Sequence, residues 1–135
     1  MNVLLIENDQ SDIILFREAL KDQDEAPDLR IAVVHSIKES LKAIMSGEYD
    51  IILLDINIDK SENLDGLKQL LKYASRMPIV VYSSVYSSEL AREAIALGAQ
   101  DYIVKGTMGK LDLVRALVHA KIRHDNLMRI RDLVQ

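Results

Sequence analysis

Hydrophobic residues occur along this chain in five short runs, separated by stretches with a helical period. The runs are aliphatic or aromatic and nearly unbroken, at residues 3–6, 31–34, 51–54, 79–82 and 102–104. Continuous runs of this length are typical of strands that are covered on both faces of a parallel sheet. Between them, apolar residues return every three or four positions, as at Ile13, Phe16 and Leu20, which is the spacing of amphipathic helices. Repeated alternation of strand and helix predicts a doubly wound α/β domain.

Polar residues between these segments predict where the helices begin and end. Ser36, with Glu39 three residues later, has the capping-box pattern for the second helix, and Gly47 suits the end of that helix. Asp9 is expected to cap the first helix, and Gly98 to end the fourth. These local signals agree with the hydrophobic pattern.

The last helix is expected to be longer than the sheet requires. No Gly or Pro occurs after Gly109, although about 12–15 helical residues suffice to cross a small sheet. We therefore assign residues 1–122 to the domain and residues 123–135 to a projecting extension of this helix. Along this last helix, apolar residues recur every seven positions, at Ala120, Leu127 and Val134. This seam suits pairing with another helix, either in a homodimer or with an effector domain or partner.

Composition describes a globular chain without thiol chemistry. Its 135 residues suit one domain, and 49% of them are hydrophobic and 28% charged. The absence of cysteine excludes disulfides, a thiol nucleophile and a cysteine metal site. No apolar run has the length of a signal sequence or a membrane span, so we expect a cytoplasmic protein with no membrane partner.

Charge is distributed unevenly along the chain. The net charge of −4 divides into −9 for residues 1–65 and +5 for residues 66–135. An acidic first half would repel phosphates, so no nucleic acid is expected as a partner. The basic side chains of the C-terminal stretch are interpreted as a solvated helix face.

The residues that follow the predicted strands carry the candidate chemistry, because the functional crevice of an open parallel sheet lies at the carboxyl ends of its strands. The residues at those ends are Glu7, Asn8, Asp9, Asp55, Ser83 and Lys105. Carboxylates that converge at such an edge are unfavourable unless cations neutralise them. The amine of Lys105 supplies one positive charge. Mg²⁺, which binds carboxylates, carbonyls and water, suits the remainder.

Taken together and in order, these segments resemble the receiver domain of two-component response regulators over essentially residues 2–122. The matching pieces are residues 5–9, 53–57, 65–66, 79–84 and 97–105. The resemblance implies a flavodoxin-like fold, in which a five-stranded parallel sheet of order 2-1-3-4-5 has helices on both faces.

The resemblance also implies phosphoryl transfer. Asp55 would accept a phosphoryl group from a phosphohistidine of a sensor histidine kinase or phosphotransfer protein. Mg²⁺ would be held by Glu7, Asn8, Asp55 and the backbone carbonyl of Asn57. A domain of this kind is a phosphoacceptor that assists its own modification, not a conventional enzyme.

Three further residues are given roles by the same resemblance. Lys105 and the hydroxyl of Ser83 would each bind a phosphoryl oxygen. Inward movement of Ser83 would leave space for Tyr102 to rotate. This rotation would switch the surface formed by the fourth helix, fifth strand and fifth helix.

The chain departs from the family pattern at three places. Asn8 stands where the family usually has a second acidic residue, which predicts weaker Mg²⁺ affinity unless Asp9 compensates. Gly106 follows Lys105 where most relatives have proline, so a looser loop is expected there. The stretch at residues 59–63 is longer than usual, and we expect it to be polar and mobile.

These departures keep an alternative function open. The chain could be a phosphorylation-independent protein-interaction module that kept the fold and has a degenerate metal site. Two other proteins of related architecture fit less well. A flavodoxin needs a phosphate cradle after the first strand, where this chain is acidic. A dehalogenase-type phosphatase needs an Asp nucleophile at that position.

Overall fold

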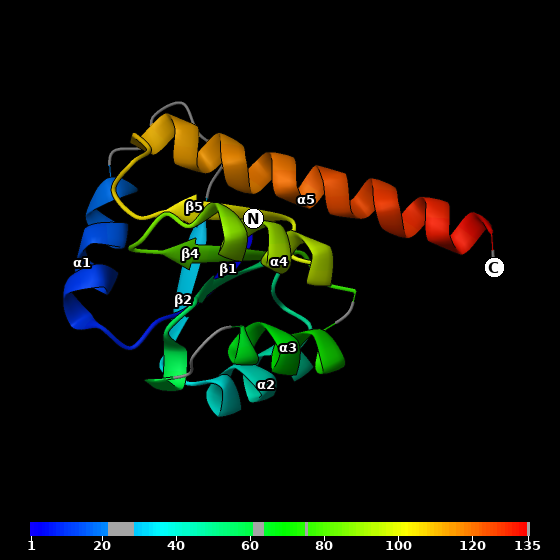
Figure 1. Cartoon of the computed structure of the whole chain (residues 1–135), viewed down its shortest axis with the longest axis horizontal. Coiled ribbons are helices and arrows are strands. Elements are labelled where there is room, and N and C mark those ends of the chain that lie inside the picture. Colours follow the sequence, from blue (N-terminus) through cyan, green and yellow to red (C-terminus); the bar gives the residue numbers. More distant parts are fainter. Residues whose placement is uncertain (22–28, 61–63, 75, 135) are drawn as a thin grey trace.

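A five-stranded parallel sheet lies at the centre of the computed structural model (Figure 1). Its strands are β1 (Asn2–Ile6), β2 (Arg30–Val34), β3 (Ile51–Asp55), β4 (Ile79–Ser83) and β5 (Asp101–Val104), in the order β2-β1-β3-β4-β5. The structure describes residues 1–21, 29–60, 64–74 and 76–134. The five predicted strands and the predicted strand order are confirmed.

Helices cover both faces of this sheet, as predicted. One face carries α1 (Gln10–Ala19) and α5 (Lys110–Leu133), and the other carries α2 (Ile37–Met45), α3 (Asp65–Tyr73) and α4 (Ser88–Leu97). A short 3-10 turn, η1 (Ile58–Lys60), precedes α3. Successive residues of β1 alternate between the two faces, so Leu5 packs with α1 and α5 while Leu4 packs with the other three helices.

Strand register brings the chemistry-bearing ends of the strands together. Ile6 of β1 is paired with Leu54 of β3, and Ser83 of β4 is paired with Val104 of β5. Because all the strands are parallel, the residues that follow them leave the sheet at one edge. The candidate site therefore lies at the carboxyl end of the sheet.

Most of the predicted helix ends are confirmed. Asp9 caps α1 by accepting a hydrogen bond from the backbone N–H of Asp12 at 3.0 Å. Ser36 caps α2 by accepting one from the N–H of Glu39 at 3.1 Å. The return bond of the capping box differs from the prediction, since the Glu39 carboxylate accepts from His35 instead of Ser36. Gly98 ends α4, as expected.

The longer stretch after β3 is partly described. Residues 61–63 of the expected mobile segment lie outside the described residues. At its start, Asp59 adopts a positive φ of 57° within η1, and its carboxylate accepts a hydrogen bond from the N–H of Ile37 at 3.2 Å. This part of the stretch is therefore bonded to the first residue of α2.

Helix α5 has 24 residues, and its C-terminal end extends past the rest of the molecule (Figure 1). Polar contacts join this end to the domain. Arg76 donates to both carboxylate oxygens of Asp132 at 3.0 and 3.2 Å, and Arg123 donates to the carbonyl of Gln100 at 3.1 Å. His124 is buried at the base of the extension, and burial lowers its pKa.

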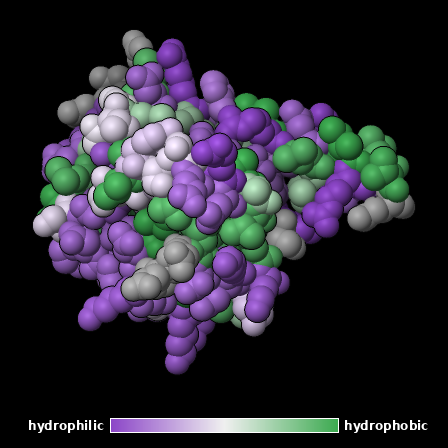
Figure 2. All heavy atoms as spheres, in the orientation of Figure 1, coloured by the Kyte–Doolittle hydropathy of each residue, from purple (hydrophilic) through white to green (hydrophobic). Residues whose placement is uncertain are grey.

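The predicted helix seam is shorter than expected. Ala120 is fully buried in the core with α1, so it is not available to a partner helix. Exposed apolar residues continue beyond it, at Leu127, Ile130, Leu133 and Val134. Figure 2 shows hydrophobic residues along the projecting end of the molecule. Among the described residues, no helix combines the length and apolar character needed to cross a membrane.

Gly98 provides a test of the packing between α3 and α4. Its φ of +130° is unfavourable for other residues, and an added Cβ would lie 3.3 Å from the Leu71 side chain. Gly47, which ends α2 with a φ of +73°, has open space around it. We expect Gly98→Ala to lower the free energy of unfolding in urea by about 2 kcal/mol and Gly47→Ala by about 1 kcal/mol. Equal losses would show that the Leu71 contact contributes nothing.

Candidate functional site

Glu7 lies at the centre of the acidic edge of the sheet. It directly follows β1, its N–H donates to the carbonyl of Val34 at 3.0 Å, and it is 1% exposed. One carboxylate oxygen accepts from the N–H of Asp9 at 3.1 Å, and the other accepts from Lys105 at 2.6 Å. The position of Glu7 is thus fixed by both the backbone and an ion pair.

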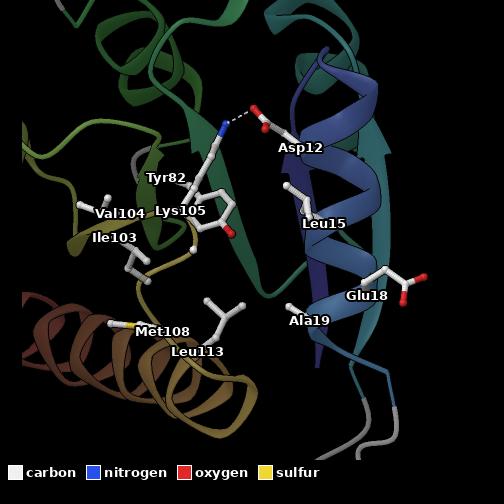
Figure 3. A pocket seen from close by; sticks show the side chains of 11 residues that line it. Asp12, Leu15, Glu18, Ala19, Tyr82, Ile103, Val104, Lys105, Met108 and Leu113 are labelled. Atoms are coloured by element: carbon white, nitrogen blue, oxygen red, sulfur yellow. Dashed lines mark hydrogen bonds and ion pairs between the residues drawn. The ribbon is translucent and has the colours of Figure 1, made fainter.

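Lys105 follows β5 and directs its amine into this edge. Its N–H donates to the carbonyl of Ser83 at 2.7 Å, which fixes the start of the loop. Its Nζ lies 2.6 Å from Glu7, 2.9 Å from Asp12 and 3.4 Å from Asp55. One amine therefore bridges carboxylates from β1, α1 and β3, and Figure 3 shows the ion pair with Asp12.

The electrostatics of this cluster follow from burial and charge pairing. Burial disfavours the charged form of Glu7 and raises its pKa, although the hydrogen bond from Lys105 opposes the shift. Burial would lower the pKa of Lys105, but the hydrogen bonds to Asp12 and Glu7 and the charge of Asp55 outweigh it and raise that pKa. Lys105 is therefore a permanent cation at physiological pH.

Asp55 is the last residue of β3, and its side chain is 8% exposed. One of its oxygens, Oδ1, is 3.4 Å from both the N–H of Asn57 and the amine of Lys105. The expected convergence of Glu7, Asp55 and Lys105 is present, and a small part of the Asp55 side chain reaches solvent.

The residues at this edge offer only oxygen ligands to a metal ion. Glu7 and Asp55 supply carboxylates, while Asn8 and Asn57 are exposed and supply amide and carbonyl oxygens. Hard oxygen donors of this kind fit Mg²⁺. The described part of the chain has no group of three or more His, Cys, Asp or Glu side chains that could hold a metal. A site here would therefore depend on amide or carbonyl oxygens as well as carboxylates.

Ser83 and Tyr102 meet at one backbone carbonyl beside this cluster. The hydroxyl of Ser83 donates to the carbonyl of Val85 at 3.1 Å, and the hydroxyl of Tyr102 donates to the same carbonyl at 2.7 Å. Both side chains help to line a cavity of about 170 Å³ that also reaches Asn57. The two residues expected to form a switch therefore share a hydrogen-bond acceptor.

A second, larger hollow is lined in part by Lys105. It has a volume of about 440 Å³ and lies between α1 and the start of α5 (Figure 3). Lys105 and Asp12 stand at one end of it, and apolar side chains line much of the rest, namely Leu15, Ala19, Ile103, Met108 and Leu113. A partner bound in this groove would lie next to the acidic edge.

The sequence prediction did not assign Asp12 to the site. Asp9 was expected near Glu7 and Asp55 or at the helix cap, and its side chain serves as the cap. Asp12, one turn further along α1, is the carboxylate that reaches Lys105. Its three-residue spacing from Asp9 was a usable signal, because such residues lie on the same side of a helix.

Comparison with known proteins identifies the chain. The family model "Response regulator receiver domain" matches residues 3–117. The chain belongs to this family. The receiver domain is 27% identical over 133 residues to the transcriptional regulatory protein DltR of Streptococcus agalactiae, covering 98% of this chain and 57% of that protein. It is 23% identical over 125 residues to the transcriptional regulatory protein ZraR of Klebsiella oxytoca, covering 90% of this chain and 27% of that protein.

Solved structures agree with the fold of the receiver domain. The signal receiver domain of a putative Luxo repressor protein from Vibrio parahaemolyticus superimposes with a TM-score of 0.74 at 22% identity. That match covers 99% of this chain and 96% of the other. The receiver domain therefore corresponds to nearly the whole of that structure, whereas it spans little more than half of DltR and about a quarter of ZraR.

Glu7 provides a test of the electrostatic cost of the site. A native pKa raised by burial means that folding becomes less favourable as pH rises above the ordinary value of 4.5. In EDTA at pH 7, Glu7→Gln should therefore raise the free energy of unfolding in urea, and the gain should shrink as pH falls toward 4.5. Glu93→Gln, an exposed change on α4, is the control and should have no such effect. A loss of stability in Glu7→Gln would mean that the ion pair with Lys105 outweighs burial.

Proposed function

We propose that this receiver domain accepts a phosphoryl group on Asp55 from a phosphohistidine of a sensor histidine kinase or phosphotransfer protein. The supporting observation is the placement of the Lys105 amine 3.4 Å from the Asp55 carboxylate and 2.6 Å from that of Glu7, at the partly open edge of the sheet. This arrangement places a nucleophilic oxygen next to a fixed positive charge. The match to the receiver family over residues 3–117 supports the same role.

The proposed transfer is a single displacement at phosphorus. An oxygen of Asp55 forms a bond to phosphorus while the bond from phosphorus to the imidazole nitrogen breaks, and the electron pair of that bond stays on the imidazole. Lys105 would bind a phosphoryl oxygen. Mg²⁺, held by Glu7, Asp55 and oxygens of Asn8 and Asn57, would neutralise negative charge on the carboxylates and the phosphoryl group.

Ser83 and Tyr102 are proposed to report this modification to the protein surface. For its hydroxyl to reach a phosphoryl oxygen, Ser83 must give up its bond to the carbonyl of Val85. That carbonyl would then interact with Tyr102 alone, whose hydroxyl already lies 2.7 Å from it. The loss of the Ser83 hydrogen bond and the accompanying change in that of Tyr102 would alter the surface of α4, β5 and α5.

Partner proteins are proposed to use two separate surfaces. The groove between α1 and α5 lies next to the phosphoacceptor, and the exposed Leu15 of α1 lines it. This surface suits a kinase or phosphotransfer protein. The interaction is proposed to take place in the cytoplasm. The exposed apolar residues at the end of α5 suit a second copy, an effector domain or an output partner. Neither nucleic acid nor a membrane is proposed as a partner.

Asp55→Asn provides the direct test of phosphorylation. Incubation with Mg²⁺ and acetyl phosphate should add the mass of one phosphoryl group to the wild-type protein and none to Asp55→Asn, because the amide lacks the nucleophilic oxygen anion. Asp112→Asn, an exposed change in the first turn of α5, is the matched control and should be labelled like the wild type. Intact-protein mass spectrometry measures the product. An unlabelled wild-type protein would contradict the proposal.

A phosphorylation-independent interaction module remains the second candidate function. It is favoured by Asn8, which supplies no charge, and by the Ser83 hydroxyl, which is bonded to Val85. The two functions differ in their response to metal.

A phosphoacceptor should be stabilised by millimolar Mg²⁺, because the ion binds only the folded cluster. We expect a rise in thermal midpoint of a few degrees that is reduced in Asp55→Asn. Ca²⁺ and Na⁺ at equal ionic strength are the controls. The same midpoint with and without Mg²⁺ would favour the interaction module.

A further inference from the structure

Asp12 is the acidic residue of the cluster to which no role has been given. It lies in the first turn of α1, and its side chain is 31% exposed. Its Oδ2 accepts a hydrogen bond from the Lys105 amine at 2.9 Å, across 93 positions of the sequence. In Figure 3 the two side chains point toward one another from α1 and from the loop after β5. This contact requires an explanation beyond helix capping, because the cap of α1 is Asp9.

The distances show how the Lys105 amine is shared. It is closer to Glu7 and Asp12, at 2.6 and 2.9 Å, than to Asp55 at 3.4 Å. Hydrogen bonds from an ammonium to a carboxylate are short, at about 2.7–2.9 Å, so the Asp55 contact is the weakest of the three. The amine is thus held toward α1 and away from the proposed phosphoacceptor.

The net charge of the cluster shows what Asp12 adds to the site. When ionised, Glu7, Asp55 and Lys105 carry a net charge of −1, because Asn8 is neutral. Asp12 brings the cluster to −2, which balances one divalent cation. Asp12 on α1 therefore supplies the negative charge that Asn8 lacks.

We propose that Asp12 is a positioning residue that draws the Lys105 amine off Asp55 and so keeps the carboxylates of Asp55 and Glu7 available to Mg²⁺. This inference rests on the proposed phosphoacceptor site and adds to it the means by which Mg²⁺ affinity is retained without an acid at position 8. Without Asp12, the amine would pair more closely with Asp55 and compete with the metal for its oxygens.

A simpler role for Asp12 is a favourable interaction of its charge with the N-terminus of α1. That role needs no contact with Lys105, and it would affect the stability of the helix but not the binding of a metal. The two roles are therefore separable by metal titration.

The test is a calorimetric titration of the metal-free, unphosphorylated protein with MgCl₂ alone. Asp12→Asn should raise the Mg²⁺ dissociation constant by about three- to tenfold, since it removes one nearby charge from the cluster and releases the amine toward Asp55. Glu18→Gln removes the same charge from the same helix, about two turns further from Lys105, and should change the constant less than twofold. Asp12→Glu keeps the charge and should stay closer to the wild type than Asp12→Asn.

A second pair of variants shows whether Asp12 acts through Lys105. In a Lys105→Gln background there is no amine to position, so adding Asp12→Asn should change the dissociation constant less than it does in the wild type. The same change in both backgrounds, or equal effects of Asp12→Asn and Glu18→Gln, would overturn the inference and leave the proposed function intact. A wild-type protein that fails to bind Mg²⁺ would overturn both the inference and the magnesium part of the proposed function.

Discussion

The carboxyl edge of the sheet depends on one amine. Parallel strands bring Glu7 and Asp55 to the same edge, and the two nearly buried carboxylates repel one another there. The amine of Lys105 lies within hydrogen-bond distance of both and remains charged because three carboxylates surround it. The buried carboxylates are therefore neutralised where they lie, because the loop after β5 brings the Lys105 amine to the same edge of the sheet.

The Lys105 amine is not equally close to the three carboxylates around it. Its shortest contacts are with Glu7 and Asp12, which leaves Asp55 as the least engaged of the three. A similar competition exists beside it, where Ser83 and Tyr102 donate to one carbonyl. A group that entered the site and took one donor from each set would change both at once. Under the proposed function, this shared acceptor would link a phosphoryl group at the sheet edge to the position of Tyr102.

The sequence predicted those features that follow from short-range rules or from strand direction. The strands, the caps at Asp9 and Ser36, and the convergence of Glu7, Asp55 and Lys105 needed only hydrophobic period, capping preference and the common edge of a parallel sheet. The strand order came from resemblance to a family. The spacing of Asp12 from Asp9 indicated only that the two residues share a side of the helix. Whether Asp12 reaches Lys105 depends also on how α1 is rotated about its axis by the packing of Ile13 and Phe16. The burial of Ala120 likewise depends on where α5 crosses the sheet.

Because α5 is long, a small tilt of the helix displaces its C-terminal end. Twenty-four helical residues span about 36 Å, and the first few turns of the helix pack on the sheet beside β5. A tilt of about 10° where the helix leaves the sheet would displace the far end of its projecting part, about 16 Å long, by roughly 3 Å. The exposed bridge from Arg76 to Asp132 restrains this swing, and ions in solution weaken such a bridge. Higher ionic strength would therefore weaken the restraint that this bridge places on the C-terminal end of the helix.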